Sequence, residues 1–289
     1  MTPPYAIDNE MYKYKGHVWW DDNESPATLR FFINPIRFAY FLRILDVHRG
    51  INYSLNTVLD VGCGGGFLTE EFAKAGYSVK GVDPAEESLD CARNHALENG
   101  LNIDYRAGCG EHLPFPDASF DIVLCCDVLE HVDDIQVVLQ EISRVLKDGG
   151  LFFYDTVNRT WASYFIVIKI LQDWPFTAQH EPRSHVWEMF VAPEELCAAM
   201  ASAKLIHKEQ RGLSARGSMI RNLINLRRRV QGKISFRELG ERLKFHESSD
   251  LRVSYMGYAV KAASEESDRE RAFRKLGQRL GFNKSGDQL

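Results

Sequence analysis

The 289-residue chain lacks the features that mark membrane-spanning, nucleic-acid-binding and secreted proteins. Its longest apolar run, WASYFIVIKIL, begins at Trp161, contains Lys169 and has about half the length of a membrane-spanning helix. Acidic residues (40) outnumber Lys and Arg (35), so the formal net charge is −5, unlike the basic charge of general nucleic-acid binders. The first residues have no apolar core of signal-peptide length. We therefore expect a cytoplasmic protein without a nucleic-acid partner.

Metal-binding cysteine motifs are missing as well. The six cysteines form neither a Cys-x-x-Cys pair nor a Cys–His ligand spacing. Cys125 and Cys126 are adjacent in an apolar run, which suits buried, reduced thiols in a cytosolic protein. With 45% hydrophobic and 26% charged residues, the composition is that of a globular protein, and we expect one large domain with an insertion or appendage.

Strand-like and helix-like segments alternate from Thr57 onward. The expected strands are 57–61, 78–83, 103–108, 120–126 and 150–157, and the expected helices between them are 67–76, 85–100 and 134–150. This alternation builds βαβ units, so we predict an α/β fold whose mostly parallel sheet has helices on both faces. Ligands on such sheets bind at the carboxyl ends of the strands.

Beyond Asn158 the pattern changes. We expect a helix at 191–203, a strand at 204–212 and a closing strand at 251–262, which brings the sheet to seven strands. The predicted organisation is an N-terminal helical cover over residues 1–50, a main domain over 51–263 with a basic helical insertion at about 219–245, and a polar tail over 264–289.

The loop DVGCGGGF, which begins at Asp60, indicates the class of cofactor. A dinucleotide fingerprint needs a third glycine where Phe67 stands, and the Asp60 carboxylate would repel a pyrophosphate. That carboxylate suits an α-ammonium group, and Gly62 and Gly64 allow close backbone approach. Asp83, at the end of the second strand, can accept both ribose hydroxyls. We predict S-adenosylmethionine; a nicotinamide cofactor and a purely structural glycine turn are the alternatives.

Longer stretches carry a family resemblance. DVGCGGG, GVD and LPFPDASFDIV, within residues 56–157, closely resemble class I S-adenosylmethionine-dependent methyltransferases, which have a Rossmann-like fold. HVWWDDNESPATLRFFINPIRFAYF, CCDVLEHV, TVNRT and SYMGYAV resemble elements of the ubiquinone-biosynthesis O-methyltransferases, over about 18–260. Those enzymes methylate phenolic or catecholic hydroxyls of polyprenylated quinone precursors, so the resemblance implies this activity and a small-molecule phenol as substrate. The basic insertion is longer than the resemblance leads us to expect.

The resemblance also implies roles for cofactor-binding residues. Arg37 would contact the methionine carboxylate, and Cys126 would lie under the methionyl and adenosyl groups. Glu111 and its two preceding neighbours would flank the adenine. The predicted cofactor-binding set is Arg37, Asp60, Gly62, Gly64, Asp83, Pro84, Cys109, Gly110 and Cys126.

The chemistry requires ionisation of the acceptor. A phenol has a pKa of about 10, so forming the phenolate at neutral pH costs roughly 4 kcal/mol, which a general base or a bound cation must offset. His131 is predicted as the base because DVLEHV sits at the carboxyl end of the fourth strand. Glu130 and His185 are the other catalytic candidates, and we interpret His180 as a surface or core histidine.

A metal site is the alternative to a base. The family has two glutamates and a histidine where this chain has Asp127, Glu130 and His131, so the resemblance implies a magnesium-type site. Asp127 is one methylene shorter than the family's glutamate, which would loosen or abolish the site. Without a metal, Glu130 and His131 would cap the following helix or act as an acid–base pair.

The sequence leaves alternative roles open for two segments and for the protein as a whole. Trp19 and Trp20 either anchor the N-terminal segment or form a lid over the ring substrate. The segment 161–174 and the basic insertion are either solvated or in peripheral contact with an anionic membrane that holds a polyprenylated substrate. The alternative functions are a small-metabolite or natural-product methyltransferase and an inert S-adenosylmethionine-binding protein. Nothing in the sequence indicates an oligomeric state.

Overall fold

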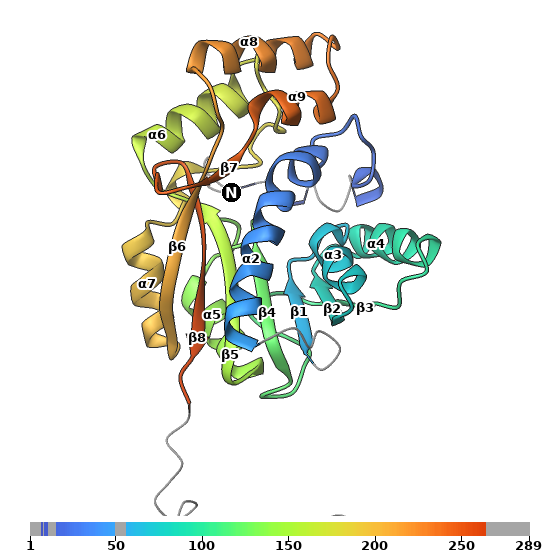
Figure 1. The fold of residues 1–289 in the computed structure, drawn as a ribbon, viewed down its shortest axis with the longest axis vertical. Coiled ribbons are helices and arrows are strands. Elements are labelled where there is room, and N and C mark those ends of the chain that lie inside the picture. Colours follow the sequence, from blue (N-terminus) through green and yellow to red (C-terminus); the bar gives the residue numbers. More distant parts are fainter. Residues whose placement is uncertain (1–6, 8, 11–15, 50–55, 264–289) are drawn as a thin grey trace, which may run out of the picture.

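The computed structural model describes residues 7, 9–10, 16–49 and 56–263, so the predicted tail at 264–289 lies outside the described residues. Within them, one sheet of eight strands has the order β3-β2-β1-β4-β5-β8-β6-β7 (Figure 1). The strands are β1 (Thr57–Val61), β2 (Ser78–Asp83), β3 (Asp104–Ala107), β4 (Phe120–Cys126), β5 (Leu146–Val157), β6 (Leu205–Ser214), β7 (His246–Ser248) and β8 (Ser254–Lys261).

The sheet is mostly parallel. β1 pairs in parallel with β2 and β4, β2 with β3, and β4 with β5. β8 is antiparallel to both β5 and β6. The predicted α/β class is confirmed and all seven predicted strands are present. The eighth strand, β7, pairs antiparallel with β6 through Gly212 and Ser248. With three residues it is too short to give a period-two pattern in the sequence.

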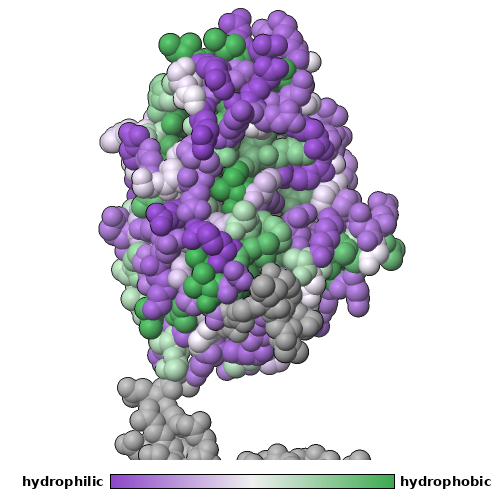
Figure 2. Space-filling model, in the orientation of Figure 1, coloured by the Kyte–Doolittle hydropathy of each residue, from purple (hydrophilic) through white to green (hydrophobic). Residues whose placement is uncertain are grey.

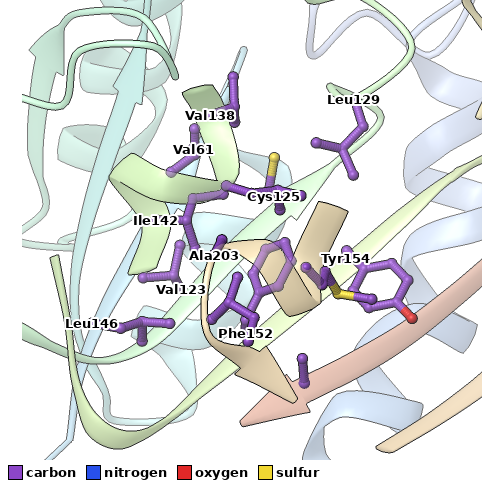
Figure 3. Close-up of a cluster of buried hydrophobic side chains, with 14 of the residues drawn as sticks. Val61, Val123, Cys125, Leu129, Val138, Ile142, Leu146, Phe152, Tyr154 and Ala203 are labelled. Atoms are coloured by element: carbon purple, nitrogen blue, oxygen red, sulfur yellow. The ribbon is translucent and has the colours of Figure 1, made fainter. Parts of the chain in front are cut away.

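Helices cover both faces of the sheet, as predicted. α2 (Asn34–Arg49) and α3 (Phe67–Lys74) pack on one face, and α5 (Ile135–Val145) and α7 (Pro193–Ser202) on the other. Because side chains alternate along a strand, the neighbours Phe152 and Phe153 enter opposite cores. Figure 3 shows the core that contains Phe152 and Cys125. α4 (Glu86–Glu98) packs beside β2 and β3. Cys125 and Cys126 are buried and free, which confirms their prediction.

The helix predicted to reach the glycine pair at residues 149–150 ends earlier, and that boundary is wrong. α5 stops at Val145, and Leu146 already has extended backbone angles (φ −69°, ψ 141°). Leu146 fits the helical period, but it pairs with Phe120 of β4 and therefore belongs to the sheet. The strand β5 therefore begins four residues before the expected start at Gly150.

A helical cover lies over the carboxyl ends of the parallel strands (Figure 1). Its parts are η1 (Gly16–Val18), η2 (Leu29–Ile33), α6 (Trp161–Ser163), η4 (Tyr164–Asp173), η5 (Trp187–Met189), α8 (Met219–Val230) and α9 (Phe236–Leu243). The basic segment thus folds into the helices α8 and α9. The side chains of Ser218 and Ser235 cap their N-termini by accepting hydrogen bonds from Arg221 N and Glu238 N. Phe32, Ile170, Leu226 and Leu239 share one apolar cluster, which joins this cover to the N-terminal segment.

Candidate active site

The glycine loop after β1 forms one wall of a cavity. Gly62 and Gly64 have positive φ angles of 70° and 49°, and glycine adopts such angles without strain. A Cβ atom on Gly62 would lie 2.3 Å from Val128 Cγ2, and one on Gly64 would lie 2.6 Å from the Trp19 ring. The backbone of this loop is therefore held close to its neighbours, with no room for a larger residue.

The predicted cofactor-binding residues come together around this cavity, which has a volume of about 420 Å³. All of them line it: Arg37, Asp60, Gly62, Gly64, Asp83, Pro84, Cys109, Gly110 and Cys126, together with Glu111. They come from α2, from β1 and the glycine loop after it, from the ends of β2 and β4, and from the loop after β3. Sequence positions as far apart as 37 and 126 therefore meet at one edge of the sheet.

Two buried carboxyl groups give this cavity its electrostatic character. Asp83 accepts hydrogen bonds from Gly64 N and Ala85 N, both at 2.9 Å, and burial raises its pKa. Asp60 accepts one from the Thr69 hydroxyl at 2.5 Å, and burial raises the pKa of Asp60 to about 7. A cationic group in the cavity would favour the ionised form of Asp60. Together with the glycine cradle, these carboxyl groups fit S-adenosylmethionine.

Arg37 is buried and engaged by three side chains. It donates to Asn34 Oδ1 and Asp127 Oδ2, both at 2.7 Å, and also forms an ion pair with Asp155. Its Nε is buried and has no hydrogen-bond partner among the described residues. Asp155 in turn accepts from Asp127 N at 2.8 Å. Asp127 is thereby held at both backbone and side chain, in a left-handed conformation with φ 55°.

The predicted metal ligands do not assemble into a metal site. The Asp127 carboxylate pairs with Arg37, whereas Glu130 is buried and accepts a hydrogen bond from Thr156 at 2.8 Å. Burial, with Asp127 and Asp155 nearby, raises the pKa of Glu130 to about 8, which favours its neutral form at pH 7. Among the described residues, no three His, Cys, Asp or Glu side chains are placed to share a metal ion. Asp127, Glu130 and His131 therefore lack the shared arrangement that the resemblance implies for them.

A second, largely apolar cavity of about 240 Å³ lies beneath the helical cover. Its walls include Phe32 of η2, Ile166 and Leu171 of η4, Leu226 of α8 and Leu243 of α9. The two cavities share four lining residues, which are Trp19, Leu29, Asp127 and His131. A molecule in the apolar cavity can therefore meet a molecule in the cofactor cavity at this junction.

Three histidines line the apolar cavity. The ring of His185 lies 5.6 Å from that of His131 and 5.0 Å from that of His180, between centroids. Burial lowers the pKa of His131 and of His180 to about 4, and it lowers the pKa of His185 well below its usual range. All three are neutral at pH 7, the form in which an imidazole can accept a proton. His180, interpreted from the sequence as a surface or core histidine, is half-buried and lines this cavity, and no periodic signal in the sequence marks its loop as a cavity wall.

The two adjacent tryptophans have different places. Trp19 lines both cavities and donates from Nε1 to Ser88 Oγ at 2.9 Å. Trp20 donates to Gly65 O at 2.9 Å and stacks on His95, with centroids 3.4 Å apart. Trp20 therefore anchors the segment, whereas Trp19 stands at the junction of the two cavities, and the lid over the ring substrate stays a prediction.

Fold and cavities together define a class, the S-adenosylmethionine-dependent methyltransferases. Residues 59–154 match the family model described as "Methyltransferase domain". The fold resembles the crystal structure of a SAM-dependent methyltransferase from Aquifex aeolicus, with a TM-score of 0.52 and 17% identity over 82% of this chain and 94% of that one. The chain is a Rossmann-like, S-adenosylmethionine-dependent methyltransferase.

Closer relatives define the family. The ubiquinone biosynthesis O-methyltransferase of Chelativorans sp. (strain BNC1) is 34% identical over 267 residues, which are 90% of this chain and 95% of that protein. The one from Hahella chejuensis (strain KCTC 2396) is 38% identical over 219 residues, 74% of this chain and 88% of that protein. The chain belongs to the ubiquinone biosynthesis O-methyltransferase family.

Proposed function

We propose that this protein methylates a phenolic or catecholic hydroxyl of a polyprenylated quinone precursor. The observation that carries the proposal is the junction, where His131 and three other residues line both the apolar cavity and the glycine-loop cavity. S-adenosylmethionine, when bound, supplies a sulfonium-activated methyl group. The protein then has to align the acceptor oxygen with that methyl group and keep water out, which is mainly a matter of positioning.

In this proposal the cofactor cavity holds S-adenosylmethionine by charge and shape. Asp60 pairs with the α-ammonium group. Asp83 accepts hydrogen bonds from the ribose hydroxyls, because its hydrogen bonds from two backbone N–H groups leave lone pairs free on the carboxylate. Arg37 donates to the methionine carboxylate from its unpartnered Nε, because both hydrogens of Nη2 go to Asp127 and Asp155 and one hydrogen of Nη1 goes to Asn34.

The acceptor cavity suits an apolar ring that bears a prenyl chain. Apolar side chains from η2, η4, α8 and α9 line it, and its polar groups gather near the histidines. The relatives named for ubiquinone biosynthesis support this class of acceptor over an unrelated small metabolite. They also weigh against an inert binding protein, because the named relatives are enzymes.

Ionisation of the acceptor is assigned to the neutral imidazoles, with His131 and His185 as the candidates. An acceptor oxygen between their rings, 5.6 Å apart, would contact both. A phenolate formed there raises the pKa of the adjacent imidazolium, which offsets part of the effect of burial. Glu130 lines neither cavity, so we assign it no contact with the acceptor. No step is assigned to a magnesium ion.

A transfer assay tests this function. The protein is incubated with methyl-labelled S-adenosylmethionine and separate catechols, prenylated phenols and small amines. We expect label on the catechols and prenylated phenols, with the prenylated acceptors used at lower concentration because their chains bury apolar surface. Label on amines alone, or tighter binding of NADH than of S-adenosylhomocysteine in calorimetry, would contradict the proposal.

We also propose that the outer face of the cover touches an anionic membrane. Within the described residues, no helix is long and apolar enough to cross a bilayer. Ile220 and Ile224 are exposed one turn apart on α8, and Arg227 and Arg228 continue the same stripe. Figure 2 shows hydrophobic side chains among hydrophilic ones at this end of the molecule. On η4, which lines the acceptor cavity, Phe165 is exposed as well.

Vesicle co-sedimentation tests the membrane contact. Binding should require anionic lipid, fall as salt rises, and weaken several-fold in Ile220→Ser because an exposed apolar anchor is lost. Leu97→Ser is the matched control, since Leu97 is equally exposed on α4, away from the cover. No sedimentation with anionic vesicles at low salt, or equal weakening in both variants, would contradict the contact.

A further inference from the structure

His185 is held by a buried hydrogen-bond network that includes the side chains of Gln172 and Ser184. The loop that carries His185 follows η4 and is tied back to it, because Gln179 N and His180 N both donate to Leu171 O, at 2.7 and 2.9 Å. Thr177 Oγ1 also donates to Ile170 O at 2.7 Å. The histidine loop is therefore fixed against the helix that lines the acceptor cavity.

The side-chain amide of Gln172, at the end of η4, is oriented by the backbone of His185. His185 N donates to Gln172 Oε1 at 2.9 Å, and Gln172 Nε2 donates to His185 O at 3.3 Å. A flipped amide would place donor against donor and acceptor against acceptor, so only this orientation satisfies both groups. Gln172 and Ser184 are both buried, with 9% and 4% of their surface exposed, so water does not readily replace these bonds.

The orientation of Gln172 dictates the direction of the next two bonds. Ser184 Oγ lies 3.2 Å from Gln172 Oε1 and 3.1 Å from His185 Nδ1. Both contacts are hydrogen bonds only when the single hydroxyl proton of Ser184 goes to Oε1, because an amide oxygen has no hydrogen to donate whereas Nδ1 can carry one. Toward His185 the hydroxyl then presents a lone pair, which requires a hydrogen on Nδ1. The other ring nitrogen, Nε2, carries the free lone pair.

We propose that Gln172 and Ser184 fix His185 as the Nδ1-protonated tautomer, so that His185 Nε2 is the base that takes the acceptor's hydroxyl proton. This rests on the O-methylation proposed above. The acceptor's O–H bond breaks and its proton goes to Nε2. The oxygen's electron pair forms the new C–O bond, and the C–S pair stays on sulfur. In this scheme His185 is the catalytic residue, and Gln172 and Ser184 are positioning residues.

The surroundings of His185 agree with this role. His131 and His180 flank its ring, and Phe190 packs on it with centroids 6.2 Å apart. Asp127 is the charged group that acts on both flanking histidines. Nε2 of His185 makes no hydrogen bond to any described residue, and the side chain lines the acceptor cavity. His131 differs, because its Nδ1 contacts an exposed side chain, Asn9, at 3.2 Å, where water can compete.

The tautomer can be measured without any activity. In the full-length protein labelled with ¹⁵N-histidine, the resonances of His185, assigned from its loss in His185→Gln, should show a protonated Nδ1 and an unprotonated Nε2. In Ser184→Ala this preference should disappear, and Ser184→Thr, which keeps the hydroxyl, should restore it. Ser202→Ala on α7, remote from both cavities, is the control. Protonated Nε2 in the wild-type protein would overturn the proposal.

The role as base is tested with acceptors that differ in acidity. Loss of a general base typically lowers the rate by 10²-fold or more. We expect His185→Gln to lower kcat by about that factor with catechol, and Ser184→Ala by about tenfold. With 4-nitrocatechol, whose hydroxyl ionises more easily, both losses should shrink to a few-fold, and the KM for S-adenosylmethionine should stay unchanged throughout.

Two results would overturn this role. Equal losses with both acceptors would mean that the network serves only structure, and an acceptor-dependent loss in His131→Gln but not in His185→Gln would assign the base to His131. A wild-type protein that methylates no phenol would instead overturn the O-methylation itself, and the base with it. The NMR measurement would then still decide whether Gln172 and Ser184 set the tautomer.

Discussion

The two cavities of this protein are built in different ways. The cofactor cavity comes largely from one stretch of alternating strands and helices, in which β1, β2 and β4 end at the same edge of the sheet. The acceptor cavity is assembled from η2, η4, α8 and α9, segments spread between residues 29 and 243 of the sequence. Local backbone requirements dictate the first, whereas tertiary packing of apolar side chains creates the second.

The largest effect should come from the backbone of the cofactor cavity. In Gly62→Ala, a Cβ atom 2.3 Å from Val128 Cγ2, at φ 70°, adds a clash to backbone strain. Strain of this kind costs about 1–3 kcal/mol, so S-adenosylhomocysteine should bind roughly five- to 150-fold more weakly in calorimetry. Gly100→Ala is the control, with φ 67° but no atom within 4 Å of the added Cβ. Equal affinity in Gly62→Ala and the wild type would mean that the loop does not hold the cofactor.

A smaller effect is expected from pH. The pKa of Asp60 is raised to about 7 in the free protein, and its ionised form is the one that pairs with the ammonium group. Lowering the pH from 8 to 6 protonates Asp60 and should weaken S-adenosylhomocysteine binding by about tenfold. The reason is that only about a tenth of Asp60 is ionised at one pH unit below its pKa. In Asp60→Asn the affinity should be lower but independent of pH over this range. A pH dependence that persists in Asp60→Asn would assign the effect to another group.

This contrast between the cavities explains what the sequence could predict. The strands β1, β2 and β4 match their expected bounds, and all predicted cofactor-binding residues line one cavity, because glycine and aspartate at strand ends are local signals. Their contacts were less predictable. Nη2 of Arg37 contacts both Asp127 and Asp155, so the Asp127 carboxylate pairs with a cationic side chain where the resemblance implies a metal ligand. No spacing in the sequence encodes that three-way contact.

Only some residues of the acceptor cavity could be predicted from the sequence. The positions of His131 after a strand and of His185 in a loop mark them as candidates, whereas nothing in the sequence indicates that the ring of His180 lies 5.0 Å from that of His185. Gln172 and Ser184 carry no motif, and only the fold of η4 brings them to His185. Buried hydrogen-bond networks of this kind depend on tertiary positions, which periodicity does not report.

The smallest effect should separate the two cavities most cleanly. Leu226 of α8 is buried in the wall of the acceptor cavity. Leu226→Ala removes apolar contact area worth about 1 kcal/mol, so the KM for a prenylated phenol should rise about fivefold. The KM for unprenylated catechol and the affinity for S-adenosylhomocysteine should hardly change. Ile206→Ala on the exposed side of β6 is the control, and equal KM increases for both acceptors would show that the chain does not lie along α8.

One measurement tests most directly whether the two cavities form a single reaction chamber. The protein is supplied with ¹³C-methyl S-adenosylmethionine and a prenylated catechol, and the product is examined by ¹³C NMR together with the yield of S-adenosylhomocysteine. The junction at Trp19, Leu29, Asp127 and His131 predicts a methyl ether carbon on the ring oxygen, formed one to one with S-adenosylhomocysteine. A methyl group on ring carbon, or S-adenosylhomocysteine released without a methylated ring, would contradict the account.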